Sequence, residues 1–297
     1  MEVARRARSV RSLGVSGDPS VAGASASVLN LASHRRRERN VPKWDPDLYL
    51  RFERERSLPC RDLIARISEV QPSRIIDLGC GTGTSTVLLR ERWPAARVVG
   101  FDNSPEMIAT ARSTHPDSEW IIGDLRSWTA DDPFDLVFSN AALHWVPNHA
   151  ELFPRLLRNV ASGGVLAVQM PVNSGSPAHR CVREVAARPT WASRWDSHLA
   201  RSKVESAEFY YRQLSPQSSE VGIWVTEYVH VLPNAAAILE WVKGTTLRPY
   251  LDLLPSPEDR ETFLGEILLE LNAAYPPQED GRVLFLFRRL FLVAHRP

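Results

Sequence analysis

Cysteine is scarce in this chain of 297 residues. The three cysteines, Cys60, Cys80 and Cys181, are odd in number, show no paired spacing, and form no CxxC motif or Cys/His cluster. These absences argue against a disulfide framework and against a zinc site. We therefore expect a protein of the reducing cytoplasm that uses no metal.

Long hydrophobic runs are also missing. No apolar stretch reaches the roughly eighteen residues that a membrane-spanning helix needs. Hydrophobic residues make up 43% of the chain and charged residues 24%, a balance typical of a globular protein. The length suits one large domain, or one domain with a sizeable insertion, and no membrane partner is expected.

Lysine is nearly absent, with 3 lysines against 33 arginines. Residues 1–43 carry nine basic and three acidic residues, a net charge of +6, so residues 44–297, with 27 basic and 32 acidic residues, have a net charge of −5. A body with this balance is not expected to bind nucleic acid through bulk charge. An anionic substrate would instead need individually placed arginines.

The first forty residues lack helical and strand periodicity and contain few bulky apolar side chains. Because such a segment cannot bury enough surface to fold alone, we predict a disordered basic extension over 1–43 and a single domain over 44–297. A transit peptide and a nucleic-acid-binding arm remain alternatives for the extension.

Between residues 48 and 169 the sequence alternates between helical and strand patterns. Ser104 followed by Pro105 is a typical helix start, with a capping hydroxyl and a proline in the first turn. Strands separated by helices indicate a parallel, doubly wound α/β sheet. The predicted helices cover 48–56, 58–70, 84–92 and 151–160, and the predicted strands cover 74–78, 97–101, 120–122, 135–139 and 165–169.

After Pro171 this alternation stops. Residues 172–220 are polar and helical in pattern, and we interpret them as a helical cap inserted into the domain. The rest of the chain is expected to complete the sheet, with strands over 223–231 and 283–294 and helices over 235–242 and 257–274.

A glycine-rich turn over 77–83, with the sequence DLGCGTG, joins a buried strand to a helix. Glycines in such a turn let a ligand approach the backbone, and the helix N-terminus offers unpaired N–H groups. The dinucleotide fingerprint GxGxxG would need its last glycine where Thr84 or Thr86 stands. The pattern present is (D/E)xGxGxG, which resembles motif I of the class I S-adenosylmethionine-dependent methyltransferases.

That resemblance implies a Rossmann-like, mostly parallel seven-stranded sheet with S-adenosylmethionine as cofactor. Three acidic residues end successive strands, where ligands of open α/β sheets bind. Asp77 can attract the cationic methionyl end, Asp102 can accept hydrogen bonds from the ribose hydroxyls, and Asp124 suits the adenine amino group. The predicted cofactor residues are Asp77, Gly79, Cys80, Gly81, Asp102, Asn103, Met107, Asp124, Leu125 and Asn140.

From Trp44 onward the chain resembles the trans-aconitate 2-methyltransferases. These enzymes transfer a methyl group to a carboxylate of trans-aconitate, giving a monomethyl ester and S-adenosylhomocysteine. The chain departs from the family in its first 43 residues and in a slightly longer cap around 191–203. The stretches that carry the resemblance lie at 44–50, 77–81, 92–97, 152–154, 164–171, 183–186, 223–224, 228–230 and 247–249.

A carboxylic acid with a pKa of roughly 4 is ionised at neutral pH, so such a transfer needs in-line positioning and no general base. The remaining carboxylates of a tricarboxylate suit arginine. Arg248 precedes a proline, so we expect it to be extended in a loop. The predicted acceptor residues are Arg56, Arg248, His230, Tyr49, Gln169 and Trp145.

Two other functions remain open from the sequence. Another small acid or a hydroxyl metabolite could be the acceptor, and a hydroxyl would give His144 or His230 the role of a base. A non-catalytic module that only binds S-adenosylmethionine is a different class of function, and the complete glycine motif argues against it. Under the main hypothesis, the protein is a monomer that binds a small tricarboxylate and no nucleic acid.

Overall fold

The computed structural model describes residues 53–67, 70–195 and 204–297. Backbone contacts divide the chain into two compact units, Met1–Asn40 and Val41–Pro297, and every described residue belongs to the second. The predicted extension over 1–43 and most of the predicted helix over 48–56 therefore lie outside the described residues.

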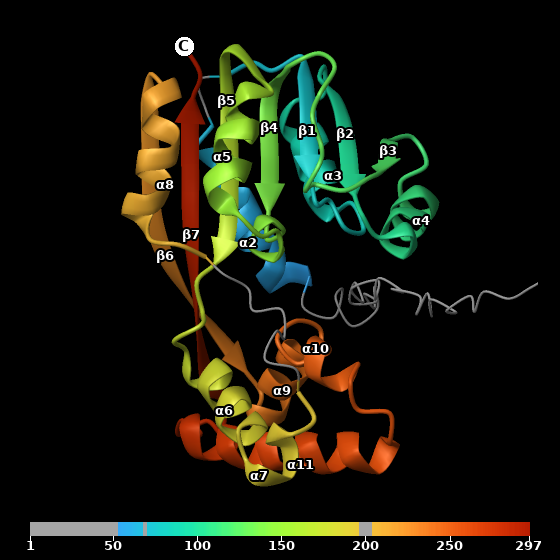
Figure 1. Ribbon diagram of the computed structural model, residues 1–297, viewed down its shortest axis with the longest axis vertical. Helices are drawn as coiled ribbons and strands as arrows, with labels where there is room; N and C mark the ends of the chain where they lie inside the picture. Colours follow the sequence, from blue (N-terminus) through green and yellow to red (C-terminus); the bar gives the residue numbers. More distant parts are fainter. Residues whose placement is uncertain (1–52, 68–69, 196–203) are drawn as a thin grey trace, which may run out of the picture. The chain divides into compact units, whose positions relative to one another are not determined.

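Seven strands form one sheet in the order β3-β2-β1-β4-β5-β7-β6 (Figure 1). Strands β1 to β5 are all parallel to one another, whereas β7 is antiparallel to both β5 and β6. This arrangement confirms the predicted mostly parallel, doubly wound sheet. The strands are β1 (Arg74–Leu78), β2 (Arg97–Asp102), β3 (Glu119–Ile122), β4 (Phe134–Asn140), β5 (Val160–Pro171), β6 (Glu220–Leu232) and β7 (Val283–His295).

The helices on either side of the sheet lie close to their predicted positions, and Ser104 caps α4 through a hydrogen bond from the Met107 N–H to its hydroxyl. The two helical turns are η1 (Leu143–Trp145) and η2 (Ser215–Gln217). The helices are α2 (Glu53–Ala65), α3 (Thr84–Arg92), α4 (Pro105–Thr114), α5 (His149–Arg158), α6 (Pro177–Ala186), α7 (Pro189–Ala192), α8 (Ala207–Leu214), α9 (Ala235–Lys243), α10 (Arg248–Leu251) and α11 (Pro257–Ala274).

Two predicted element boundaries are wrong. The break expected between helices over 48–56 and 58–70 does not occur, because α2 continues through Pro59. Burial of Leu63 in the core beneath this helix outweighs the helix-breaking effect of an internal proline. Val160, predicted at the end of a helix, is instead the first residue of β5, where it pairs with Phe134.

Each face of the sheet is covered by its own helices. Helices α2 and α3 contribute to the hydrophobic core on one face, together with Phe138 of β4 and Phe291 of β7. Helices α5 and α8 contribute to the core on the other face, with Leu166 of β5 and Leu292 of β7. Because alternate strand residues point to opposite faces, this assignment fixes which polar residues at the strand ends face α2.

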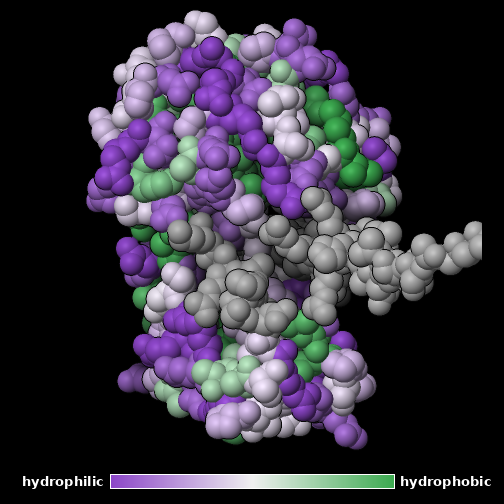
Figure 2. All heavy atoms as spheres, viewed as in Figure 1, coloured by the Kyte–Doolittle hydropathy of each residue, from purple (hydrophilic) through white to green (hydrophobic). Residues whose placement is uncertain are grey.

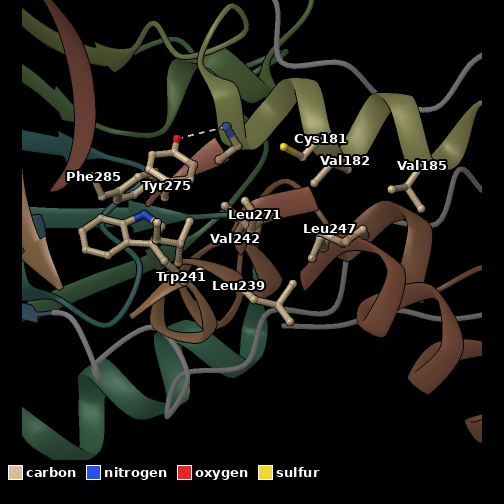
Figure 3. Packing of buried hydrophobic residues seen from close by; sticks show 14 of the residues in the cluster. Cys181, Val182, Val185, Leu239, Trp241, Val242, Leu247, Leu271, Tyr275 and Phe285 are labelled. Atoms are coloured by element: carbon tan, nitrogen blue, oxygen red, sulfur yellow. Dashed lines mark hydrogen bonds between the residues drawn. The ribbon is translucent and has the colours of Figure 1, made fainter. Parts of the chain in front are cut away.

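Helices α6, α7, α9, α10 and α11 surround a separate hydrophobic core, which we call the cap. Strands β6 and β7 run on from the sheet into it and contribute Leu232 and Phe285 (Figure 1). Figure 3 shows Trp241 and Tyr275 within this core, where the Tyr275 hydroxyl accepts a hydrogen bond of 3.0 Å from the Ala178 N–H.

The cap differs in extent from the predicted insertion over 172–220. It draws helices from 177–192 and also from 235–274, whereas α8 packs beside α5 on the sheet. Tyr210 of α8 explains this, because its fully buried ring contacts Phe153 and its hydroxyl hydrogen-bonds to His149 of α5 at 2.7 Å.

The described surface on the face drawn in Figure 2 is mostly hydrophilic, with smaller hydrophobic patches. Paired residues of β6 and β7 expose apolar side chains on the side of the sheet that α8 partly covers, namely Val225, Val229, Val231, Leu284 and Leu286. None of the helices in the described part of the chain is both long and apolar enough to cross a membrane.

Candidate active site

The carboxyl ends of β1 and β4 mark the point where the strand order reverses. From β1 the chain moves to β2 on one side, and from β4 it moves to β5 on the other. Ligands of open α/β sheets bind in the crevice outside such a point. The glycine-rich turn over 77–83 lies there, between β1 and α3.

The three glycines of this turn all have positive φ angles, but for different reasons. A Cβ at Gly79 (φ 76°) would lie 2.1 Å from the Ala142 Cβ, and one at Gly83 (φ 96°) would lie 2.5 Å from the Trp120 ring. A Cβ at Gly81 (φ 56°) would meet no described atom within 4 Å. Gly79 and Gly83 are thus required by packing, whereas Gly81 borders open space that a ligand can fill.

Asp102 links this turn to the next strand. Its Oδ2 accepts a hydrogen bond of 2.9 Å from the Gly81 N–H, and its Oδ1 accepts one of 2.9 Å from the Ser104 N–H. Burial raises the pKa of Asp102, although the backbone donors act in the opposite direction. Each oxygen keeps a lone pair for a ligand hydroxyl.

Asp77 is fully buried at the end of β1. Its Oδ2 accepts hydrogen bonds from the hydroxyls of Ser85 at 2.6 Å and Thr86 at 2.7 Å, which fix the start of α3. No described residue hydrogen-bonds to its Oδ1. Burial raises the pKa of Asp77 to about 6. One carboxylate oxygen therefore remains available to a ligand or to water.

The other predicted cofactor residues lie around this centre. Cys80 is buried, and its N–H donates to the Phe101 carbonyl at 3.1 Å. Met107 and Leu125 are also buried, whereas Asn103 is exposed.

Asp124 has an ionic partner that the sequence pattern did not predict. Its carboxylate binds the guanidinium of Arg126, and it accepts a hydrogen bond of 2.8 Å from the Arg126 N–H. These hydrogen bonds lower the pKa of Asp124. Its negative charge is therefore already partly compensated before any ligand binds.

Asn140 and Gln169 lie opposite each other where β4 and β5 end. Gln169 is fully buried, and neither atom of its amide, nor the Asn140 Oδ1, has a hydrogen-bond partner among the described residues. Ala141 follows with a φ of 53°, an uncommon value for a residue with a side chain. Buried amides without partners are rare in proteins and are expected where a ligand binds.

The predicted acceptor residues that the structure describes come from several different elements. Tyr49 and the side chain of Arg56 lie outside the described part of the structure. His230 is packed 4.9 Å from the Trp241 ring in the aromatic part of the cap. Trp145 lies in η1, with its ring 4.8 Å from His144.

Arg248 does not lie in an extended loop, as the following proline had led us to expect. It is the first residue of α10, where a proline fits because the first turn needs no N–H donor. Its Nε lies 3.0 Å from a carboxylate oxygen of Asp252 one turn along. Its charge is therefore balanced within the cap.

Sequence reasoning missed Arg289. It lies on β7 opposite Pro171 of β5, and only 5% of its surface is exposed. The signal available was an Arg-Arg pair inside an otherwise apolar strand, of which one arginine must point inward. Within the described ranges, no three His, Cys, Asp or Glu side chains are grouped so that they could hold a metal ion.

Comparisons with known proteins agree with this geometry. A family model described as a methyltransferase domain matches residues 75–164, which include the glycine-rich turn, Asp102, Asp124 and Asn140. The fold resembles that of the YcgJ protein from Bacillus subtilis, with a TM-score of 0.53 and 14% identity over 80% of this chain and 97% of that one. These findings, with the strand order, define a Rossmann-like class I methyltransferase.

The particular family follows from more similar relatives. The chain is 46% identical over 256 residues to a trans-aconitate 2-methyltransferase of Azoarcus sp. (strain BH72), which covers 86% of this chain and 100% of that protein. It is 44% identical over 252 residues to one of Rhizobium rhizogenes, covering 84% of this chain and 98% of the relative. The chain belongs to the trans-aconitate 2-methyltransferase family.

Proposed function

We propose that this protein transfers the methyl group of S-adenosylmethionine to a carboxylate of trans-aconitate, giving a monomethyl ester and S-adenosylhomocysteine. The observation that carries the proposal is the 46% identity to a relative of that name over that relative's whole length. Similarity over the whole length includes the cap as well as the glycine-rich turn, and acceptor choice depends on more than the cofactor site.

The residues at the carboxyl ends of β1 and β2 fit this cofactor. Gly81 leaves room beside the backbone, Asp102 has lone pairs for two ribose hydroxyls, and Asp77 keeps an oxygen for the cationic methionyl end. Leu125 and Met107 supply apolar walls for adenine, with Asn103 and Asp124 beside it. When bound, S-adenosylmethionine supplies an electrophilic methyl group on a sulfonium.

The protein's own task is then to bind and orient. An acceptor carboxylate is ionised at neutral pH and needs no base, so catalysis comes from alignment and from exclusion of water. His144 supports this reading, because burial lowers its pKa to about 3. An imidazole with so low a pKa is a poor base, which disfavours His144 as the base that a hydroxyl acceptor would need.

The direct test uses S-adenosylmethionine labelled on its methyl group and a panel of di- and tricarboxylic acids. We expect label to appear with trans-aconitate in a product that mild base hydrolyses, as a methyl ester requires. Transfer to another acid but not to trans-aconitate would contradict the acceptor, and label in a base-stable product would contradict the ester. We also infer a cytoplasmic monomer that needs no metal, nucleic acid or membrane, and size measurement in solution tests the monomer.

Cofactor binding should weaken as the pH falls through about 6. Below the pKa of Asp77, which is about 6, the carboxyl group becomes neutral and no longer attracts a cationic ligand. We expect calorimetric titration with S-adenosylhomocysteine to show a loss of about tenfold between pH 7.5 and 5, corresponding to roughly 1.4 kcal/mol.

The variant Asp77→Asn should bind weakly at every pH and lack this step. The raised pKa of Asp77 predicts the opposite pH dependence for the free energy of unfolding. Between pH 3.8 and about 6 the native state holds a proton on Asp77 that the unfolded chain has released. The wild type therefore loses stability as the pH rises from about 4 to about 6, so Asp77→Asn should gain stability relative to it over that range and keep a constant difference from pH 7 to 8. Parallel pH profiles of the two proteins would contradict the assignment.

A further inference from the structure

Arg289 carries a positive charge into the interior of the protein. It lies between Pro171 of β5 and Thr226 of β6, and 5% of its surface is exposed. Its guanidinium carbon lies 4.3 Å from the centre of the Phe287 ring, a contact that orients the side chain. Removing a guanidinium from water is costly, so a buried arginine is retained where its charge has a use.

The strand register places Arg289 on the same side of the sheet as the polar residues at the strand ends. Asn140 pairs with Gln169, Gln169 pairs with Phe291, and Arg289 lies two residues before Phe291 on β7. Alternate residues of a strand share a face, and a diagonal neighbour across an antiparallel pair is within reach of a long side chain. Asn140, Gln169 and Arg289 therefore form one row along the face that packs on α2.

Gln169 of this row and the nearby His144 have hydrogen-bonding atoms that the described protein leaves unused. Gln169 is fully buried with both amide atoms unpaired, and His144, with 7% of its surface exposed, has no described partner at Nδ1. His144 lies in η1, directly after β4 ends at Asn140, and the charge of Arg289 contributes to the lowered pKa of its imidazole. An N–H of Gln169 and an N–H of neutral His144 are donors suited to a carboxylate.

The row also divides the site by charge. Asp77 and Asp102 lie on the β1 and β2 side and suit a cationic cofactor, whereas Arg289 lies on the β7 side. A tricarboxylate is negatively charged, so its binding site needs positive charge, whereas the site of the cationic cofactor needs negative charge. The tricarboxylate must therefore approach the cofactor from the β7 side, away from the carboxylates of Asp77 and Asp102. We infer that Arg289 binds a carboxylate of the acceptor, in a subsite that Gln169 and His144 complete with hydrogen bonds.

The carboxylate bound by Arg289 is one that does not react. A guanidinium paired with the attacking oxygen would hold its electron pair and weaken it as a nucleophile. Paired with a neighbouring carboxylate, the same guanidinium anchors the acceptor through two parallel hydrogen bonds and leaves the attacking group unpaired. Arg289 is therefore a substrate-binding residue that sets specificity for acids with more than one carboxylate.

The test compares Arg289→Met and Arg289→Lys with Arg288→Met. Arg288 is the matched control, because it is the neighbouring arginine on the opposite face of β7, and its side chain is 58% exposed. We expect Arg289→Met to raise the KM for trans-aconitate about 100-fold, the scale of losing a buried charge partner. Arg289→Lys should raise it less, since a lysine keeps the charge without the two parallel hydrogen bonds. Arg288→Met should leave the KM within twofold.

Two readouts separate acceptor binding from a damaged fold. Calorimetric affinity for S-adenosylhomocysteine should be unchanged in Arg289→Met, and the KM ratio between variant and wild type should shrink for analogues that lack one carboxylate of trans-aconitate. An unchanged KM in Arg289→Met, an equal rise in Arg288→Met, or a KM ratio that is the same for every analogue would each overturn the inference.

The inference rests on the proposed function, and titration of trans-aconitate into the complex with S-adenosylhomocysteine distinguishes their failures. Wild-type protein that binds trans-aconitate but forms no ester would refute the reaction, while loss of that binding in Arg289→Met would still support the subsite. Wild-type protein that forms the ester, with unchanged binding in Arg289→Met, would refute the subsite alone. A wild-type protein that neither binds nor methylates the acid would refute both.

Discussion

Alanine at position 81 should abolish most cofactor binding, while the fold loses only the stability that a left-handed residue with a side chain costs. The added methyl group would enter space in which no described atom lies within 4 Å of it, so the described part of the protein offers no clash. The cost to the folded state is then the left-handed conformation at a φ of 56°, roughly 1–2 kcal/mol for a residue with a Cβ. A cofactor packed against this backbone, however, would meet the methyl group directly.

A clash of this kind costs about 1–3 kcal/mol, so the affinity for S-adenosylhomocysteine should fall by about fivefold to 150-fold. Gly163→Ala is the matched control. Gly163 also has a positive φ, of 74°, and also borders open space, but it lies at the opposite end of the sheet, near the start of β5. The two variants should lose similar stability in thermal unfolding, and only Gly81→Ala should lose cofactor affinity.

Gly79→Ala makes the complementary case. Its methyl group would lie 2.1 Å from the Ala142 Cβ, so this variant should lose far more stability than Gly81→Ala. If Gly81→Ala bound S-adenosylhomocysteine as well as Gly163→Ala does, the open space at Gly81 would not be the cofactor site, and the glycine-rich turn would serve only the packing of β1 on α3.

The structural features that the sequence predicted correctly are those that depend on local geometry. A glycine between a buried strand and a helix, a Ser-Pro helix start, and an acidic residue at a strand end all act within a few residues of the chain. Asp102 shows this, because its partners are the N–H groups of Gly81 and Ser104, both at neighbouring strand ends of a predictable parallel sheet. The geometry at these strand ends was therefore predictable in outline, and the binding of the cofactor there stays a prediction.

The acceptor half depends on register between distant strands. Arg289 lies diagonally across from Gln169 only because β7 runs antiparallel between β5 and β6, a pairing that the sequence of neither strand indicates. The conformation of Arg248 was predicted wrongly for a similar reason, since its partner Asp252 comes within reach only once α10 exists. The boundaries of the cap could not be predicted either, because the place of Tyr210 depends on its packing against Phe153 and His149 of α5.

The second large effect is expected at Asp102, whose removal should weaken cofactor binding more than any other single change at the strand ends. The carboxylate holds the N–H groups of Gly81 and Ser104, and it offers further lone pairs to two ribose hydroxyls. Hydrogen bonds to a charged group are worth about 1.5–3 kcal/mol each, so Asp102→Ala should weaken S-adenosylhomocysteine binding at least about 100-fold. Asp102→Asn should be little better, because its NH2 group would face a backbone donor.

The control must lose equivalent hydrogen bonds from two backbone N–H groups without touching the cofactor, and Asp135 meets this requirement. Its Oδ2 accepts hydrogen bonds from the N–H groups of Ser73 at 2.8 Å and Arg74 at 2.9 Å, at the amino end of β1 rather than its carboxyl end. Asp135→Ala and Asp102→Ala should therefore both lower the melting temperature. Only Asp102→Ala should lower the affinity for S-adenosylhomocysteine, measured by calorimetry at a temperature at which both variants are folded. Near-wild-type affinity in Asp102→Ala would mean that this carboxylate only joins the glycine-rich turn to α4, and the ribose would then have to be bound elsewhere.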